Sequence, residues 1–384
     1  MVSIVSGIIF FLLLCYIVLL MQYKKWFSHL KEFHVNNTHP SGNLRFSIII
    51  PARDEEENID LCLRSILAND YPLNSYEILV IDDFSTDQTA RIIQDISSRY
   101  LNVRLLKMEH LIPNAAQLNS YKKKAIELAI GKSTGDWIIT TDADCTVGPK
   151  WLSSFEKYID QTNNIFVAAP VKFTNNGSFI SIFQGLDFLS LQGITAASVS
   201  AGFHSMCNGA NLCYKKEAFL AVDGFKGVDQ LASGDDMFLM HKIQTAFPDR
   251  IGYLFGREVI VSTKPMPDVK SFLNQRIRWA SKADSYQDKR IIFVLVGVYL
   301  LNLSLLLGLL ACFFYPPFIL IWLISIFVKI LFEIRFLLPV SRFYNSTKLL
   351  LYFPLMEIPH IIYTVLAGFL GKFGKYQWKG RTVK

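Results

Sequence analysis

The chain has 384 residues, of which 51% are hydrophobic and 18% charged, and its formal net charge is +7. The apolar residues gather in long runs, and much of the positive charge lies beside these runs, where anionic lipid headgroups attract it. No basic stripe on a recognition element accompanies this charge, which argues against nucleic-acid binding. The six cysteines include no C-x-x-C pair, which argues against a zinc site, and in a cytoplasmic domain they are expected to be reduced thiols and not disulfides.

The first apolar run covers residues 4–21, carries no charge and is followed by Lys24 and Lys25. Its length fits a membrane-spanning helix. A signal peptide is the alternative, but the run has no basic segment before it and no small-residue cleavage site after it. We therefore expect residues 1–22 to form a transmembrane anchor.

A second apolar block occupies residues 291–340, with Pro316-Pro317 near its middle, and is long enough for two spans joined by a tight turn. A further stretch, 348–371, is apolar but contains four unusual residues: Pro354, Glu357, Pro359 and His360. It fits either a kinked span or a re-entrant, interfacial segment. We expect a transmembrane region over 291–371 and a basic tail over 372–384.

Basic residues follow the first apolar run and precede the second: Lys24, Lys25, Lys31, Arg276, Arg278, Lys282 and Arg290. By the positive-inside rule, residues 22–290 lie in the cytoplasm, and a bacterial inner membrane is the expected location. Four full spans would put the basic tail outside, whereas its charge favours the inside. The sequence therefore leaves open whether 348–371 crosses fully.

Between the membrane segments, strands and helices alternate after a polar linker at 34–44. We expect strands at 46–50, 77–81, 103–106 and 137–140. We also expect four helices: one that ends near Ala68, one that begins after a cap at residues 85–87, one over 122–130 and one over 151–159. Alternation of this kind predicts an α/β domain over 45–265 with a mostly parallel sheet. An amphipathic interfacial helix is expected to follow over 266–290.

Two carboxylates, Asp142 and Asp144, follow the last of these strands. Like charges so close repel each other and shift each other's pKa, unless a cation lies between them. Asp-x-Asp directs two oxygen ligands toward one point, which suits a hard divalent cation that itself holds phosphates. A helix cap with a solvated acid is the alternative for this motif alone.

Acids follow the other strands as well, and ligands of parallel sheets bind at the carboxyl ends of their strands. That edge carries Asp54, Asp82, Asp83, Asp142 and Asp144. A dehydrogenase is a poor fit, because the first turn has no G-x-G-x-x-G and its acids would repel a pyrophosphate. The acids fit better if some bind a base or ribose and others hold a metal ion.

The ordered set of motifs resembles membrane-bound glycosyltransferase family 2, and the similarity covers roughly residues 46–282. The matching segments are Pro51-Ala52-Arg53-Asp54-Glu55, Asp82 to Asp87, Lys123-Lys124-Ala125, Thr141 to Asp144, Asn208 to Asn211, Ser233 to Asp236 and Gln275 to Trp279. The resemblance implies a GT-A fold, Rossmann-like, flanked by transmembrane helices. It also implies transfer of a sugar from a nucleotide-sugar donor with inversion, and a divalent cation, Mg²⁺ or Mn²⁺.

On the donor side, the resemblance assigns nucleotide-sugar binding to Pro51, Arg53, Asp54, Asp82, Asp83, Lys124 and Asp142. A helix-capping or turn role is the alternative for Asp82. Lys124 matches the diphosphate-side lysine, although Lys122 and Lys123 leave the register open, and a solvated basic helix face is the alternative. Asp144 matches the metal ligand.

On the acceptor side, Asp236 matches the general base, and Asp235 stands where the family often has Glu, which leaves open which acid is the base. Asn208 and Gly209 match an acceptor-side loop, for which a simple turn is the alternative. Gln275, Arg278 and Trp279 match the Q-x-x-R-W motif, whose arginine can hold a diphosphate and whose tryptophan can stack on a sugar. An amphipathic helix with its Trp and Arg at the lipid headgroups is the alternative, and the two are compatible.

The leading expectation is a transferase that adds one sugar, most naturally from a UDP-sugar, to a lipid acceptor at the cytoplasmic face of the membrane. A processive polysaccharide synthase with a glycan acceptor is the alternative among enzymes. A catalytically idle membrane protein that keeps the fold as a binding module is the alternative from another class.

Overall fold

A computed structural model describes residues 2–35, 40–112, 118–231, 233–373, 376–378 and 381–383. The chain divides into two compact units, which we describe separately. The α/β unit comprises residues 31–173, 205–264 and 377–384, and the helical unit comprises residues 1–30, 174–204 and 265–376. Part of the expected linker, residues 36–39, lies outside the described residues.

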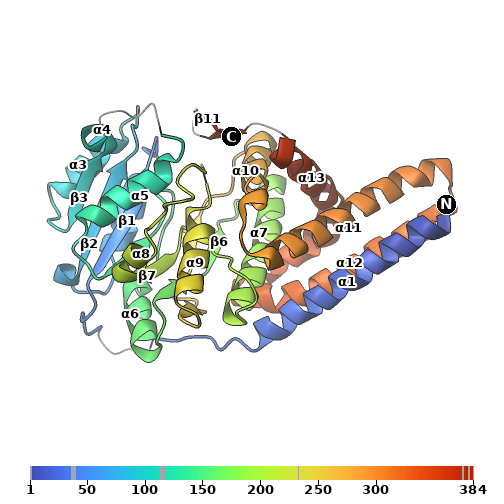
Figure 1. Cartoon of the computed structure of the whole chain (residues 1–384), viewed down its shortest axis with the longest axis horizontal. Coiled ribbons are helices and arrows are strands. Elements are labelled where there is room, and N and C mark those ends of the chain that lie inside the picture. Colours follow the sequence, from blue (N-terminus) through green and yellow to red (C-terminus); the bar gives the residue numbers. More distant parts are fainter. Residues whose placement is uncertain are drawn as a thin grey trace. The chain divides into compact units, whose positions relative to one another are not determined.

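The α/β unit is built on a seven-stranded sheet with the order β3-β2-β1-β4-β7-β5-β8 (Figure 1). Its strands are β1 (Phe46–Ala52), β2 (Tyr76–Asp82), β3 (Val103–Lys107), β4 (Trp137–Thr140), β5 (Phe166–Ala168), β7 (Leu212–Lys215) and β8 (Ile251–Tyr253). The first four pair in parallel, as predicted, whereas β7 is antiparallel to both of its neighbours. The mostly parallel α/β fold is thus confirmed.

Burial explains why these apolar runs form central strands. Ile48, Ile49 and Ile50 are consecutive in β1 and all 0% exposed, so both faces of the sheet are covered. The short strands β6 (Val171–Phe173) and β9 (Val261–Thr263) form a separate parallel pair. Two further short strands, β10 (Tyr376–Trp378) and β11 (Arg381–Val383), pair with each other.

The helices of the α/β unit alternate with the strands along the chain. They are α2 (Ile59–Leu67), α3 (Thr89–Ser97), α4 (Met108–Leu111), α5 (Tyr121–Lys132), α6 (Trp151–Gln161), α8 (Lys216–Ala221) and α9 (Asp235–Ala246), with a 3₁₀ turn η1 (Leu73–Ser75) before β2. The predicted cap at residues 85–87 is observed at Asp87, whose Oδ1 accepts from the Thr89 N–H at 2.9 Å. Gln88, the residue directly before α3, makes no side-chain cap.

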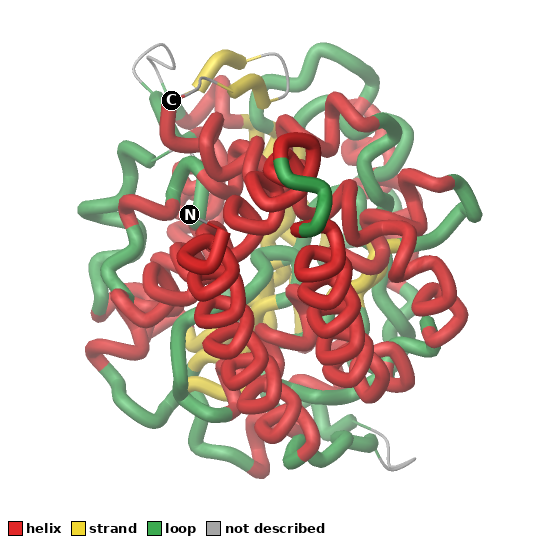
Figure 2. Tube along the Cα trace, turned by 90° about the vertical axis from the view of Figure 1, so that its right-hand side faces the viewer, coloured by secondary structure: helices red, strands yellow, loops and turns green. Residues whose placement is uncertain are grey.

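The helical unit contains α1 (Val2–Ser28), α7 (Phe179–Ser200), α10 (Val269–Ala280), η3 (Ala283–Ser285), α11 (Lys289–Phe314), α12 (Phe318–Phe343), η4 (Thr347–Tyr352) and α13 (Phe353–Phe373). The helix with Q-x-x-R-W therefore ends at Ala280, before the predicted limit of 290. Figure 2 looks along α1, α11 and α12 from the end at which the N-terminus lies.

Three segments among the described residues are long and apolar enough to cross a membrane: Ile4–Ser28, Lys289–Phe314 and Thr347–Phe373. With 27 residues, α1 is about 40 Å long, more than the hydrocarbon thickness of a bilayer. α12 is comparably long but carries Lys329, Glu333 and Arg335. The structure confirms two helices separated at Pro316-Pro317, and α13 continues as a helix through Pro359.

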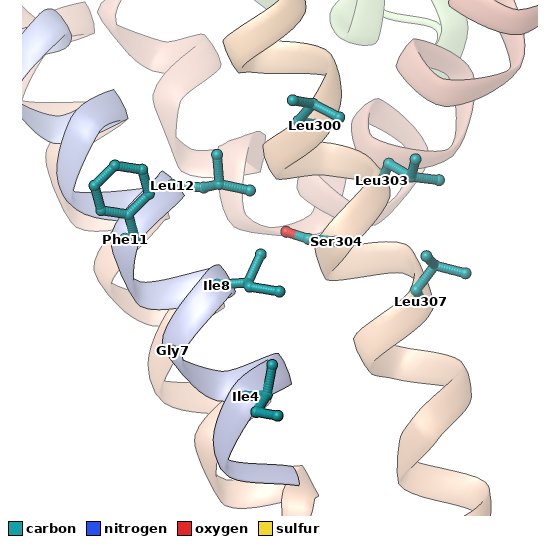
Figure 3. A pocket seen from close by; sticks show the side chains of 9 residues that line it. All are labelled: Ile4, Gly7, Ile8, Phe11, Leu12, Leu300, Leu303, Ser304 and Leu307. Atoms are coloured by element: carbon teal, nitrogen blue, oxygen red, sulfur yellow. The ribbon is translucent and has the colours of Figure 1, made fainter. Parts of the chain in front are cut away.

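The apolar character of these helices persists on their outer surface. An open hollow between α1 and α11 is lined almost entirely by aliphatic and aromatic side chains, with Ser304 as an exception (Figure 3). Side chains of this kind suit contact with lipid acyl chains rather than water. The three apolar segments therefore fit an integral membrane protein.

Candidate active site

The first two strand–helix turns of the α/β unit are tied together by Arg53 and Asp54. Arg53 Nη1 donates to the carbonyl oxygen of Asp83 at 2.8 Å. Asp54 adopts a positive φ of 48°, and its Oδ1 accepts from the Thr86 N–H at 2.8 Å while its own N–H donates to Ser85 Oγ at 3.0 Å. The hydrogen bonds offset the cost of this unusual backbone conformation.

Asp82 and Asp83 follow directly, at the carboxyl end of β2, and are only 5% and 2% exposed. Burial raises the pKa of Asp82, although hydrogen bonds from Ser85 act in the opposite direction. Pro51 lies within β1, opposite Ile81 of β2. The structure thus brings the residues predicted for the nucleoside side together at the carboxyl ends of two adjacent strands.

Asp142 and Asp144 lie beyond the end of the neighbouring strand β4. Their carboxylate oxygens and the Cys145 sulfur lie within 4.8 Å of one another. Asp144 Oδ2 accepts from Thr263 Oγ1 at 3.1 Å, and its Oδ1 lies 3.6 Å from Cys145 Sγ. Burial, and then repulsion from Asp142 and Glu55, raise the pKa of Asp144 to about 6.

This donor set fits a divalent cation. Two carboxylates at such short range repel each other, and a bound cation offsets both that repulsion and the cost of burial. Carboxylate oxygens are the ligands that Mg²⁺ and Mn²⁺ prefer. Among the described residues of this unit, Asp144 and Asp142 would hold the ion, and the metal role of Asp144 stays a prediction.

Lys122 connects this acidic pair with a second one. Its Nζ lies 2.7 Å from Asp142 Oδ1 and 3.5 Å from Asp235 Oδ2. Burial opposes the charged form of the lysine, but the two carboxylates prevail and raise the pKa of Lys122 above its ordinary value. Lys122 is thus a charged group held between the end of β4 and the start of α9.

The second acidic pair, Asp235 and Asp236, opens α9 after Gly234, whose φ of 84° favours glycine. Acids in the first turn are favoured by the helix dipole. Asp236 Oδ2 also accepts from the Gly209 N–H at 3.1 Å, so the helix start is joined to the loop before β7. A Cβ at Gly209 would lie 3.3 Å from Asp235 Oδ2, so this loop approaches the acids closely.

The same loop is fixed from the sheet side. Thr140 Oγ1, at the end of β4, donates to the carbonyl oxygen of Gly209 at 2.9 Å. Asn208 Oδ1 accepts from the Ala210 N–H at 3.0 Å. This bond is typical of a simple turn, which is the alternative to an acceptor-side loop at this position. Gly209 therefore links the end of β4 to the start of α9, and the Asn208 side chain shapes the turn.

Comparisons with known proteins bear on the family of this chain. The model of glycosyl transferase family 2 matches residues 47–219, and that of glycosyl transferase family group 2 matches residues 137–370. The chain belongs to glycosyl transferase family group 2. The resemblance drawn from the motifs is thereby confirmed.

Similar proteins include glycosyltransferase AglE of Haloferax volcanii, 33% identical over 216 residues, which are 56% of this chain and 65% of the relative. The beta-monoglucosyldiacylglycerol synthase of a Nostoc species is 30% identical over 112 residues, 29% of this chain and 23% of the relative. The chain thus spans less than two thirds of these relatives.

Among solved structures, the mannosyltransferase PcManGT of Pyrobaculum calidifontis, in complex with GDP-Man and Mn²⁺, is similar with a TM-score of 0.56 and 16% identity. The similarity covers 96% of this chain and 99% of that one. At this identity the likeness bears on the fold, and it confirms the expected GT-A architecture with flanking apolar helices.

Three further predicted residues lie in the helical unit. Gln275, Arg278 and Trp279 belong to α10 and are half-buried, and Gln275 Oε1 accepts from Arg276 Nη1 at 2.9 Å. Asp268 caps this helix, accepting from the Ser271 N–H at 2.8 Å. The roles of the three residues toward a ligand stay predictions.

The sequence leaves open which lysine of residues 122–124 contacts the diphosphate, and the contacts of the three side chains differ. Lys123 is 1% exposed and donates to three carbonyl oxygens ahead of α9, those of Val228, Leu231 and Ser233. Lys124 pairs with Glu127 of its own helix at 3.4 Å. Lys122 is thus the lysine of residues 122–124 that contacts Asp142 and Asp235, whereas the motif favours Lys124 for the diphosphate.

These contacts give a direct test of the register. Lys122→Met is expected to lower donor affinity or turnover roughly tenfold or more, because a charge-assisted bond contributes about 1.5–3 kcal/mol and its loss leaves two acids unpaired. Lys124→Met, the matched variant on the same helix, is expected to stay within about twofold, since a surface pair contributes little. Calorimetric donor titration and transfer rates measure both. The opposite ranking would restore Lys124 as the diphosphate residue.

Proposed function

We propose that this protein is an inverting glycosyltransferase that moves a sugar from a nucleoside-diphosphate sugar to a membrane lipid acceptor. The observation that carries the proposal is the junction of two acidic pairs, Asp142 with Asp144 and Asp235 with Asp236, through Lys122 and the Gly209 loop. Such a site offers one pair for a metal-bound diphosphate and another for an acceptor. Membership of the family supports the same reaction class.

Donor binding is assigned to the carboxyl ends of β1 and β2. Asp54, Asp82 and Asp83 offer carboxylate acceptors suited to the donor groups of a base and the hydroxyls of a ribose. Arg53 is already committed to the Asp83 carbonyl oxygen, so we assign it the role of holding this turn. A UDP-sugar is the expected donor, and the GDP-Man in the similar mannosyltransferase makes a guanosine donor the first alternative.

Asp144, with Asp142 beside it, would hold Mg²⁺ or Mn²⁺. When bound, the ion would supply charge neutralisation for the departing diphosphate. Thr263 orients the Asp144 carboxylate toward this role through its hydrogen bond. Lys122 contributes a second positive charge close to Asp142.

Acceptor activation is assigned to Asp236. The hydroxyl proton passes to its carboxylate as the acceptor oxygen bonds to the anomeric carbon. The bond from that carbon to the diphosphate oxygen breaks, and its electron pair leaves with the nucleoside diphosphate. One displacement from the opposite face inverts the anomeric centre. The Gly209 N–H holds the carboxylate in place for this step.

The apolar helices and the glycolipid synthase among the relatives support a lipid acceptor. We assign the α/β unit to the cytoplasmic side of a bacterial inner membrane, since lysines and arginines follow the first apolar run and precede the second. A poly-beta-1,6-N-acetyl-D-glucosamine synthase of Staphylococcus epidermidis, 24% identical over 244 residues, keeps a processive synthase as the second candidate.

The deciding experiment incubates the full chain in native membranes with a panel of UDP- and GDP-sugars and Mn²⁺, followed by mass spectrometry of lipid extracts. A lipid that gains one sugar supports the proposal. A growing polymer points to the processive synthase instead. No transfer and no hydrolysis of any donor points to a binding module and would overturn the enzymatic proposal.

The topology gives a separate prediction. A cysteine introduced by His34→Cys, in a background with Cys15→Ser and Cys312→Ser, is expected to resist an impermeant thiol reagent on intact cells and to react after lysis. Tyr315→Cys, in the turn between α11 and α12, is the matched control and is expected to react on intact cells; Tyr315 is 48% exposed. Labelling of the His34→Cys protein on intact cells would reverse the assigned orientation.

A further inference from the structure

Arg276 lies inside the Q-x-x-R-W motif but at one of its unspecified positions. It is only 5% exposed, and its Nε donates to Asp187 Oδ2 of α7 at 3.0 Å, with a second bond from Nη2. A guanidinium buried to this extent requires a well-bonded carboxylate, and removal of one partner leaves an uncompensated charge. The pair therefore joins α10 firmly to α7.

A third helix completes the same cluster. The Tyr363 hydroxyl of α13 donates to Asp187 Oδ1, and His360 Nε2 lies 4.0 Å from that oxygen. Phe272 of α10 packs edge-on against Tyr363 with ring centroids 5.1 Å apart. Asp187 is thus the common acceptor of α10 and α13, which also pack against each other.

Arg276 also contacts two residues of the motif itself. Its Nη1 donates to Gln275 Oε1 at 2.9 Å, and its guanidinium carbon lies 4.2 Å from the centroid of the Trp279 ring. A guanidinium group is planar, so it can stack on an aromatic ring and at the same time donate hydrogen bonds within its own plane. A lysine ammonium group cannot combine the two interactions in this way. One buried arginine therefore fixes the side chains of both Gln275 and Trp279.

We propose that Arg276 and Asp187 are positioning residues: through them, Gln275 and Trp279 are held ready for the ligand of this helix. Because Arg276 is committed to Asp187, the arginine that we assign to the ligand is Arg278. Preorganised binding groups depend on supporting contacts of this kind. The ligand itself, a diphosphate or an acceptor sugar, rests on the proposed function, whereas the anchor rests on the contacts alone.

The first test examines the anchor without any transfer reaction. In Asp187→Asn, hydrogen exchange of the full chain in detergent is expected to accelerate at least tenfold in peptides covering Val269–Ala280, with α5 unchanged. Glu357→Gln is the matched control: it removes a buried acid of the same unit that pairs with Lys329 and should leave α10 exchange as in the wild type. Unchanged α10 exchange in Asp187→Asn would overturn the anchor. Arg276→Lys provides the second variant if Asp187→Asn does not fold.

The second test asks whether the pair acts through Trp279. Arg276→Lys is expected to lower kcat/KM roughly tenfold to hundredfold, the scale of a misplaced binding group. In a Trp279→Ala background the same change should cause a smaller further loss than in the wild type, because the ring that Arg276 positions is already gone and only the effect through Gln275 remains. Glu357→Gln should instead add its full effect to that of Trp279→Ala.

Fully additive losses for Arg276→Lys and Trp279→Ala would overturn the positioning role. If the wild type transfers no sugar from any donor, the proposed function fails, and the exchange experiment still decides whether Arg276 and Asp187 anchor α10.

Discussion

Asp144→Ala is expected to abolish the metal-dependent part of nucleoside diphosphate binding. Asp144 lies beyond β4 with its carboxylate oriented by Thr263, and it shares a donor cluster with Asp142. Alanine removes one of two hard oxygen ligands at a site where the cation would hold the diphosphate. Calorimetric titration of UDP and GDP, each with and without Mn²⁺, measures the effect as the difference between the two affinities.

Asp95→Ala serves as the control for this variant, because Asp95 is an exposed acid of α3 in the same unit. It should retain the full metal-dependent difference in affinity. Metal-dependent binding that survives in Asp144→Ala would remove the metal role from Asp144, and Asp142 would be the next residue to vary.

The donor side of the site was largely predictable because buried parallel strands are recognisable in the sequence as short runs of consecutive apolar residues. Three consecutive buried isoleucines identify β1, and acids at the ends of β1, β2 and β4 must meet at one edge once these strands pair in parallel. Acids that are far apart in the sequence but follow parallel strands therefore lie close together in the fold. The antiparallel insertion of β7 between β4 and β5 has no comparable signal, since it depends on contacts remote in sequence.

Side-chain direction was the part that the sequence left undetermined. Three consecutive lysines on a helix point about 100° apart, and only the observed contacts distinguish Lys122, which faces Asp142, from Lys124, which faces Glu127. Arg276 and Asp187 are 89 positions apart, so no local pattern links them. Inside α10 the sequence offers two arginines, and burial separates the anchored one from Arg278.

Asp236→Asn is expected to preserve the fold and donor affinity but to lower turnover by roughly a hundredfold or more, the usual scale for loss of a general base. The amide oxygen can still accept from the Gly209 N–H, as Asp236 Oδ2 does at 3.1 Å, so the helix start should remain in place. What the amide cannot do is take a proton from an acceptor hydroxyl. Transfer rate and calorimetric donor affinity are to be measured on the same preparation.

Asp235→Asn separates this role from simple helix capping. If both acids only stabilised the first turn of α9, each substitution would cost about 1 kcal/mol of stability and leave turnover nearly intact. Asp235 lies 3.5 Å from Lys122, so its neutralisation should mainly disturb that lysine and reduce turnover less than Asp236→Asn does. A fully active Asp236→Asn protein would exclude Asp236 as the base. Asp235, whose carboxylate faces the same Gly209 loop, would then be the acid that takes the proton.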